Sequence, residues 1–145
     1  AELCGKDHGF MPIVVVAKAP ADYAKWVEEQ KGVAVAAAEA ADREWSMDEL
    51  MAKGEQVYNT SCAACHQANG QGLPPAFPAI AGSAVATGDE LVHIDRVLNG
   101  KAGTAMAAYR DVLNDGDLAA VLTYQRNAWG NSASAIQPAA VKAAR

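Results

Sequence analysis

The chain has 145 residues, of which 51% are hydrophobic, and a formal net charge of −5 at pH 7. This length suits one domain of ordinary size with shorter flanking segments. The charged residues are scattered rather than gathered into basic runs, which argues against nucleic acid as a partner, and no apolar run is long enough to span a membrane.

Residues 1–31 are predicted to be the end of a β domain. The β-branched run over 11–17 is typical of a buried strand, and a lone strand cannot pair its own backbone. Because the chain starts with Ala rather than Met, we expect it to be a piece of a longer protein. Residues 22–30 predict a short helix, and the Ala- and Glu-rich residues 32–45 predict a linker that is partly helical.

A second domain is predicted over residues 46–130. Ser46 followed three residues later by Glu49 forms a capping-box pattern, which marks the start of a helix. Apolar and small residues then recur at helical spacing, namely Met47, Leu50, Met51, Gly54, Val57 and Tyr58.

The remainder of this domain alternates loops with two more predicted helices. Glycine and proline over residues 69–88 predict an irregular loop, and Asp89 can cap a helix that stops at Asn99-Gly100. A loop over 101–114 precedes a last helix, which Asn114 or Asp115 can cap and which ends before Gly130. Residues 131–145 are rich in Ala and Ser and are expected to form a flexible tail.

The run Cys62-Ala63-Ala64-Cys65-His66 is the pattern for covalent attachment of a c-type haem. Two thiols on one helical turn can reach the two vinyl groups of a porphyrin, and the next residue turns an imidazole towards the iron. The alternatives are a redox-active cysteine pair and half of a zinc site. A redox pair would need a βαβ context and zinc a second Cys or His pair, and the sequence has neither.

A six-coordinate haem needs a second axial ligand, for which Met106 and His93 are the candidates after His66. Met106 lies in a predicted loop among small residues, so its side chain is free to approach the iron. His93 lies in a predicted helix, where a surface or hydrogen-bonded histidine is the more common role. A His66–Met106 pair would leave no open position on the iron, which favours electron transfer over oxygen or peroxide chemistry.

Residues 46–130 resemble a class I cytochrome c, and the resemblance rests on Gly54, Tyr58, the haem motif, Met106 and the last helix with Leu118 and Tyr124. It implies a mainly α-helical fold around a covalent haem. It also implies that the first and last helices cross at Gly54. In this family a loop after the haem motif, here residues 73–78, accepts a hydrogen bond from the proximal histidine.

The N-terminus resembles the copper loop of cytochrome c oxidase subunit II, whose pattern is Cys-x-Glu-x-Cys-x-x-x-His-x-x-Met. The resemblance implies that Glu2 (through its carbonyl), Cys4, His8 and Met11 are ligands of a binuclear copper centre. Thiolate, imidazole and thioether suit copper. The first cysteine of the pattern would fall before Ala1, so this chain is expected to hold an incomplete, truncated part of a cupredoxin domain, with binuclear copper bound only in the full-length protein.

A copper loop followed by a cytochrome c domain resembles subunit II of the caa-type oxidases. The resemblance implies an electron carrier on the periplasmic face of the bacterial inner membrane, attached to it through missing upstream segments. Its partners would be the other oxidase subunits, above all subunit I, and an upstream cytochrome c or bc complex as donor. Oxygen reduction would belong to another subunit, so whether the chain counts as an enzyme depends on that assembly.

Two other functions stay open on the sequence. One is an independent soluble cytochrome c with a vestigial copper-like loop. The other is a haem peroxidase or sensor whose sixth coordination position is open or labile.

Overall fold

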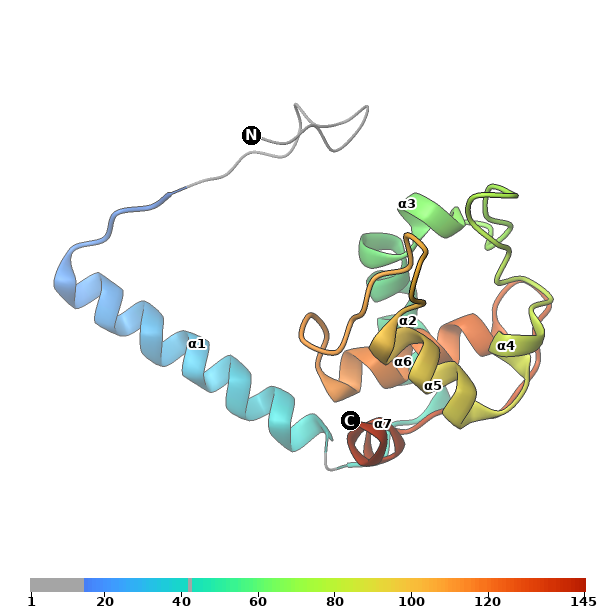
Figure 1. The fold of residues 1–145 in the computed structure, drawn as a ribbon. Coiled ribbons are helices and arrows are strands. Elements are labelled where there is room, and N and C mark those ends of the chain that lie inside the picture. Colours follow the sequence, from blue (N-terminus) through green and yellow to red (C-terminus); the bar gives the residue numbers. More distant parts are fainter. Residues whose placement is uncertain (1–14, 42) are drawn as a thin grey trace. The chain divides into compact units, whose positions relative to one another are not determined.

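A computed structural model describes residues 15–41 and 43–145, and within these ranges the chain forms seven helices and no sheet (Figure 1). The only strand-like feature there is an isolated bridge between Leu73 and Phe77. The prediction of a mainly helical fold is therefore confirmed. Most of the strand predicted over 11–17 lies outside the described residues, and residues 15–17 are not part of a strand.

The chain divides into two compact units, Ala1–Ala34 and Val35–Arg145. The first helix, α1, spans Pro20–Ala41, with proline at its first position, where the missing N–H removes no helical hydrogen bond. The sequence predicted a helix only over 22–30, followed by a partly helical linker. The structure instead continues the helix through residues 32–41, a stretch rich in alanine, which has the highest helix propensity.

In the second unit, α2 spans Met47–Ser61 and begins with the predicted capping box. The Ser46 hydroxyl accepts a hydrogen bond from the Glu49 N–H, and the Glu49 carboxylate accepts one from the Ser46 N–H at 2.8 Å. Arg43 also donates to Glu49 at 2.8 Å. Hydrogen bonds from Arg43 and Ser46 lower the pKa of Glu49 to about 2, so the cap stays charged over the physiological range.

Five further helices follow, each short and most of them capped. They are α3 (Ala63–His66), α4 (Ala84–Thr87), α5 (Glu90–Asn99), α6 (Asp115–Asn127) and α7 (Pro138–Ala144). Asp89 caps α5 through its side chain, as the sequence predicted, and Asn114, one of the two candidate caps for α6, caps that helix. The first residues of α5 and α6, and the last residue of α5, lie within one residue of their predicted positions.

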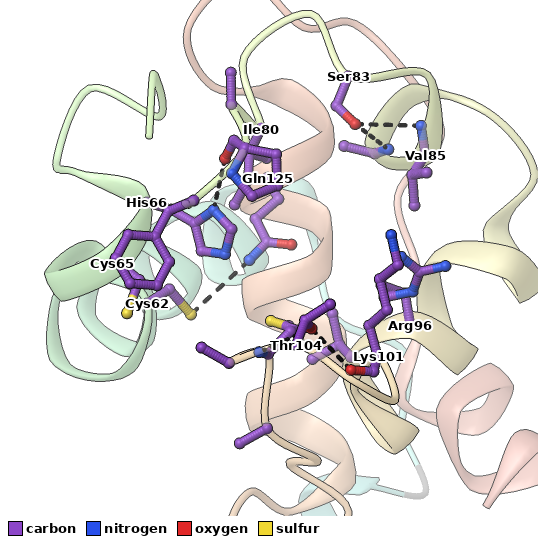
Figure 2. A pocket seen from close by; sticks show the side chains of 18 of the residues that line it. Cys62, Cys65, His66, Ile80, Ser83, Val85, Arg96, Lys101, Thr104 and Gln125 are labelled. Carbon is purple, nitrogen blue, oxygen red and sulfur yellow. Dashed lines mark hydrogen bonds between the residues drawn. The ribbon is translucent and has the colours of Figure 1, made fainter. Parts of the chain in front are cut away.

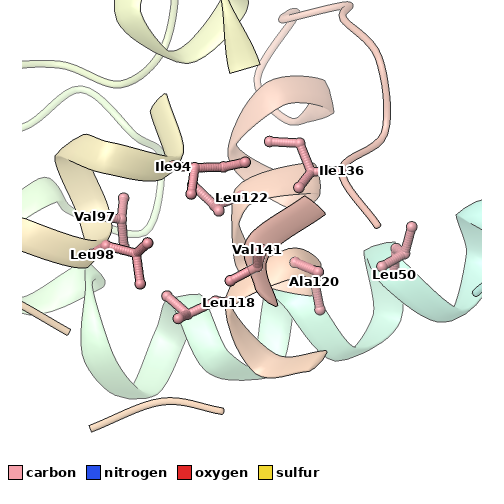
Figure 3. Packing of buried hydrophobic residues seen from close by; sticks show 10 residues of the cluster. Leu50, Ile94, Val97, Leu98, Leu118, Ala120, Leu122, Ile136 and Val141 are labelled. Atoms are coloured by element: carbon pink, nitrogen blue, oxygen red, sulfur yellow. The ribbon is translucent and has the colours of Figure 1, made fainter. Parts of the chain in front are cut away.

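The hydrophobic core lies where α2, α5, α6 and α7 meet (Figure 3). Helix α6 is buried on nearly all sides, so it lacks the solvent-exposed polar face of a typical amphipathic helix. The larger core side chains are Leu50, Ile94, Val97, Leu98, Leu118, Leu122, Ile136 and Val141, all at most 4% exposed.

Gly54 lets α2 and α6 cross at close range. A Cβ atom at residue 54 would collide with the carbonyl oxygen of Ala120 and would lie 2.6 Å from the Tyr124 Cβ. Both of these belong to α6, and α2 and α6 form the most extensive helix pair of the described residues. The crossing at Gly54 that the resemblance implied is therefore present.

The expectation of a flexible tail over 131–145 is wrong. Ile136, Pro138 and Val141 are fully buried. The Thr123 hydroxyl donates to the Ile136 carbonyl and accepts from the Ile136 N–H, which fixes this segment to α6. The Gln137 side chain bonds both the N–H and the carbonyl of Trp45, so the segment also closes over the start of the domain. The Ala- and Ser-rich composition of this segment gave no indication of these contacts.

We predict that Gly54→Ala destabilises the domain by about 2 kcal/mol. Overpacking a close helix crossing typically costs about 1–3 kcal/mol, which exceeds the roughly 1 kcal/mol that alanine gains in helix propensity. Denaturant unfolding followed by circular dichroism measures the change. Gly32→Ala, on α1, is the matched control, because no atom lies within 4 Å of the position that its methyl group would take. Equal stabilities for the two variants would contradict the role given to Gly54.

Candidate haem site

Cys62, Cys65 and His66 share a single turn of backbone at the end of α2. The Cys62 N–H still donates to the Tyr58 carbonyl of α2, at 2.8 Å. The N–H groups of Cys65 and His66 both donate to the Cys62 carbonyl. This turn carries the two thiols and the imidazole on one side of a cleft, as Figure 2 shows.

The His66 ring is oriented by one backbone carbonyl. Its Nδ1 lies 2.9 Å from the carbonyl oxygen of Pro78, so Nδ1 carries the proton and donates. This leaves Nε2 as the unprotonated nitrogen that can bind a metal, an arrangement common for histidine ligands. The sequence pointed to a carbonyl within 73–78, and the structure identifies it as that of Pro78.

The cleft beside this turn has a volume of about 520 Å³, within the range of sites that hold a small molecule or cofactor. Cys62, Cys65 and His66 line it together with Met106, which comes from the loop between α5 and α6. The structure therefore brings the four residues that the sequence singled out into one cavity. Apolar side chains make up much of its remaining wall, among them Ile80, Val85, Val97, Leu113 and Val121.

The loop that carries Met106 is fixed by its own hydrogen bonds. The Met106 N–H donates to the Thr104 hydroxyl, and the Met106 carbonyl accepts from the Lys101 N–H at 3.0 Å. Tyr109 ties the loop to its surroundings, since its hydroxyl donates to the Ser61 carbonyl at 2.8 Å and its N–H donates to Val97. Because Ser61 directly precedes Cys62, the hydrogen bond from Tyr109 links the two sides of the cleft.

The opposite loop, which follows the haem motif, is held by residues just after α6. The Trp129 indole donates to the Ala68 carbonyl, and its ring packs against Tyr58 and Tyr124. The Asn131 side chain accepts from the Gly82 N–H at 2.7 Å and donates to the Ile80 carbonyl. Trp129 and Asn131 therefore position the segment that contains Pro78, a role that the sequence pattern did not predict.

The two thiols fit haem attachment better than the alternatives. Burial raises the pKa of Cys62 to about 11, whereas redox-active thiols have a lowered pKa. Among the described residues, no three His, Cys, Asp or Glu side chains gather as a metal-ion site. A cleft walled by apolar groups, with two thiols, an imidazole and a thioether, suits a covalently bound porphyrin.

His93 is not a surface residue, although it is hydrogen-bonded as expected. It is only 3% exposed, lines the cleft, and donates from Nε2 to the Gln125 side-chain oxygen at 2.9 Å. Gln125 in turn points its amide nitrogen at the Cys62 sulfur, 3.9 Å away (Figure 2). Among the described residues, His93 Nδ1 is the buried side-chain polar atom that lacks a hydrogen-bond partner.

The copper ligands predicted from the N-terminal resemblance, Glu2, Cys4, His8 and Met11, lie outside the described residues. Within the described ranges, no helix has both the length and the hydropathy needed to cross a bilayer.

We predict that His93 makes the domain less stable in mild acid. Burial lowers the pKa of His93 from 6.5 to about 4, so between these values the unfolded chain binds a proton that the folded chain does not. This contribution to the free energy of unfolding is fully present above pH 6.5. It is lost as the pH falls towards 4, and the total loss is about 3 kcal/mol. Denaturant unfolding at a series of pH values should show a shallower decline for His93→Gln, and identical slopes would contradict this assignment.

Comparison with known protein families agrees with this geometry. The family model described as cytochrome C oxidase, cbb3-type, subunit III matches residues 49–124, about half of the chain. A cytochrome c-552 from Thermus thermophilus is 36% identical over 94 residues, which cover 56% of this chain and 71% of that protein.

Two other relatives are longer proteins, of which this chain spans well under half. The cytochrome c subunit of a quinone alcohol dehydrogenase from Gluconobacter oxydans is 30% identical over 90 residues, covering 55% of this chain and 19% of that protein. Cytochrome c oxidase subunit 2 from Alkalihalophilus pseudofirmus is 30% identical over 138 residues, covering 88% of this chain and 37% of that protein. With its haem motif, its helical fold and these matches, the chain belongs to the cytochrome c family described as cytochrome C oxidase, cbb3-type, subunit III, whose domains transfer electrons through a haem.

Proposed function

We propose that this domain transfers electrons within subunit II of a respiratory cytochrome c oxidase. Cys62 and Cys65 would hold the haem through thioethers, and His66 and Met106 would bind its iron. The haem supplies reversible one-electron exchange. The protein keeps it in an apolar cleft, with both axial side chains on hydrogen-bonded backbone, so that little rearrangement accompanies the change of charge.

The observation that supports electron transfer is that His66 and Met106 line one cavity from separate segments, each fixed independently. The Pro78 carbonyl sets the His66 ring, and Thr104 and Lys101 set the Met106 backbone. If His66 and Met106 both bound the iron, no position would remain on it for oxygen or peroxide. This argues against the peroxidase and sensor alternatives.

Two sequence features support the finer assignment to an oxidase subunit. One is the resemblance of residues 2–11 to a copper loop. The other is that the alignment with the Alkalihalophilus subunit 2 covers 88% of this chain, and so extends well beyond residues 49–124. The proposed electron acceptor is then the binuclear copper centre of the same polypeptide, which the intervening segment would hold at a high effective concentration.

An independent carrier is the second candidate, favoured by the match to a cytochrome c-552 of which this chain covers 71%. The gene upstream of Ala1 separates the two. A cysteine directly before Ala1, preceded by strands and two membrane spans, supports the oxidase subunit. An upstream sequence without them supports the independent carrier.

We predict that haem and copper exchange electrons within one molecule of the full gene product. After flash reduction of the haem, the copper absorbance should change at a rate that does not depend on protein concentration, because donor and acceptor share one chain. Cys4→Ser is the control, since it removes a copper ligand and should abolish the copper signal while leaving haem reduction intact. A rate proportional to protein concentration would contradict intramolecular transfer.

A further inference from the structure

Two buried polar side chains from different helices meet in the wall of the cleft. His93 lies on α5 and Gln125 on α6, and both are at most 4% exposed. Removal of polar groups from water is costly, whereas apolar side chains of similar volume would pack between the two helices without that cost. Neither His93 nor Gln125 is among the four residues proposed to hold the haem, so the pair needs an explanation of its own.

The direction of the Gln125 amide follows from its two neighbours. Its Oε1 accepts a hydrogen bond from His93 Nε2 at 2.9 Å, and its Nε2 points at the Cys62 sulfur, 3.9 Å away (Figure 2). Once haem is attached, this sulfur would be a thioether, which has no proton and can only accept. An amide turned the other way would place its oxygen against an atom that offers no donor. The observed direction therefore suits the thioether.

His93 holds the Gln125 amide in this direction. Burial lowers the pKa of His93 to about 4, so its ring is uncharged at neutral pH and carries one proton. That proton is on Nε2, because the Gln125 oxygen can only accept. His93 Nδ1 is then left buried without a partner among the described residues, which is destabilising. What the ring provides is a fixed donor for Gln125.

The backbone at both ends of the contact between Gln125 and Cys62 is also fixed. The Gln125 carbonyl lies in the last turn of α6, where it has no helical partner, and it accepts from the Asn131 side chain at 2.7 Å. The Cys62 N–H donates to the Tyr58 carbonyl of α2 at 2.8 Å. The amide N–H is therefore held at the sulfur in advance of any reaction.

We infer that Gln125, oriented by His93, donates a hydrogen bond to the Cys62 thioether and thereby raises the reduction potential of the haem. The inference rests on the proposed attachment of haem at Cys62. The positive end of the amide dipole would lie beside the porphyrin, where it disfavours the additional positive charge of the ferric state. Because both side chains are buried, water screens this dipole little. Gln125 and His93 thus tune the site without binding the iron.

Redox potentiometry of the holoprotein at neutral pH tests this inference. Gln125→Met keeps the length of the side chain but removes the N–H donor. We expect the ratio of ferrous to ferric haem at a fixed applied potential to fall about threefold, because the ferric state is no longer disfavoured. His93→Phe leaves the amide but removes the donor that orients it, so it should lower the ratio in the same direction. His93→Gln retains a side-chain N–H donor and should stay close to the wild type.

Two controls separate tuning of the haem from structural damage. Thr123 is also a buried polar residue of α6, but it bonds Ile136 and does not line the cleft, so Thr123→Val should lower stability and leave the potential unchanged. The double variant of His93→Phe with Gln125→Met should match Gln125→Met alone, since both changes remove the same hydrogen bond.

Three results would overturn the inference. They are a wild-type potential in Gln125→Met, shifts that add in the double variant, and a His93→Gln protein that behaves like His93→Phe. If Gln125→Met does not fold, Gln125→Leu removes the same donor with a different shape. The two His93 variants change α5 rather than α6, so they test the orienting role independently of the packing of α6.

Failure of the proposed function has a different signature. If the domain does not carry electrons through a haem in this cleft, the wild type itself shows no reversible one-electron step. If the domain carries electrons but the Gln125 amide does not act on the haem, the wild type shows that step and Gln125→Met shows it at the same potential.

Discussion

The close crossing of α2 and α6 at Gly54 is the contact on which the haem site depends. Helix α2 ends at Ser61, one residue before Cys62, so the position of α2 decides where the thiols and the imidazole lie. Helix α6 supplies Val121 and Gln125 to the wall of the same cleft. A larger side chain at residue 54 would push the two helices apart, and with them the attachment turn and the wall that faces it.

The two loops that complete the cleft are held to this helix pair by different means. The Met106 loop is tied through Tyr109 to the Ser61 carbonyl, while Trp129 and Asn131 hold the loop with Pro78. Arg126 adds a buried connection, since its guanidinium donates to the carbonyls of Ala86, Gly88 and Ser134. Because these carbonyls belong to the short helix α4, to its C-cap Gly88 and to the segment after α6, they stabilise the buried charge and hold the two segments together.

Much of the helical framework could be predicted from local chemistry. Ser46 and Glu49 mark the start of α2 because a capping box needs only neighbouring residues, and Asp89 and Asn114 mark α5 and α6 in the same way. The haem motif is equally local. Apart from the Gly54 crossing that the family resemblance implied, features that depend on contacts between distant residues could not be predicted. The burial of His93 and the packing of residues 131–145 depend on α6, and composition suggested the opposite for the tail.

The proposed function depends above all on a haem held in the cleft between His66 and Met106. Absorption spectroscopy of the ferric holoprotein tests this assignment, through the weak charge-transfer band from a thioether sulfur to iron. We expect the wild type to show this band, Met106→Ala to lose it, and Met51→Ala, on α2 and away from the cleft lining, to keep it. A wild type without the band, or a spectrum that Met106→Ala leaves unchanged, would contradict the assignment.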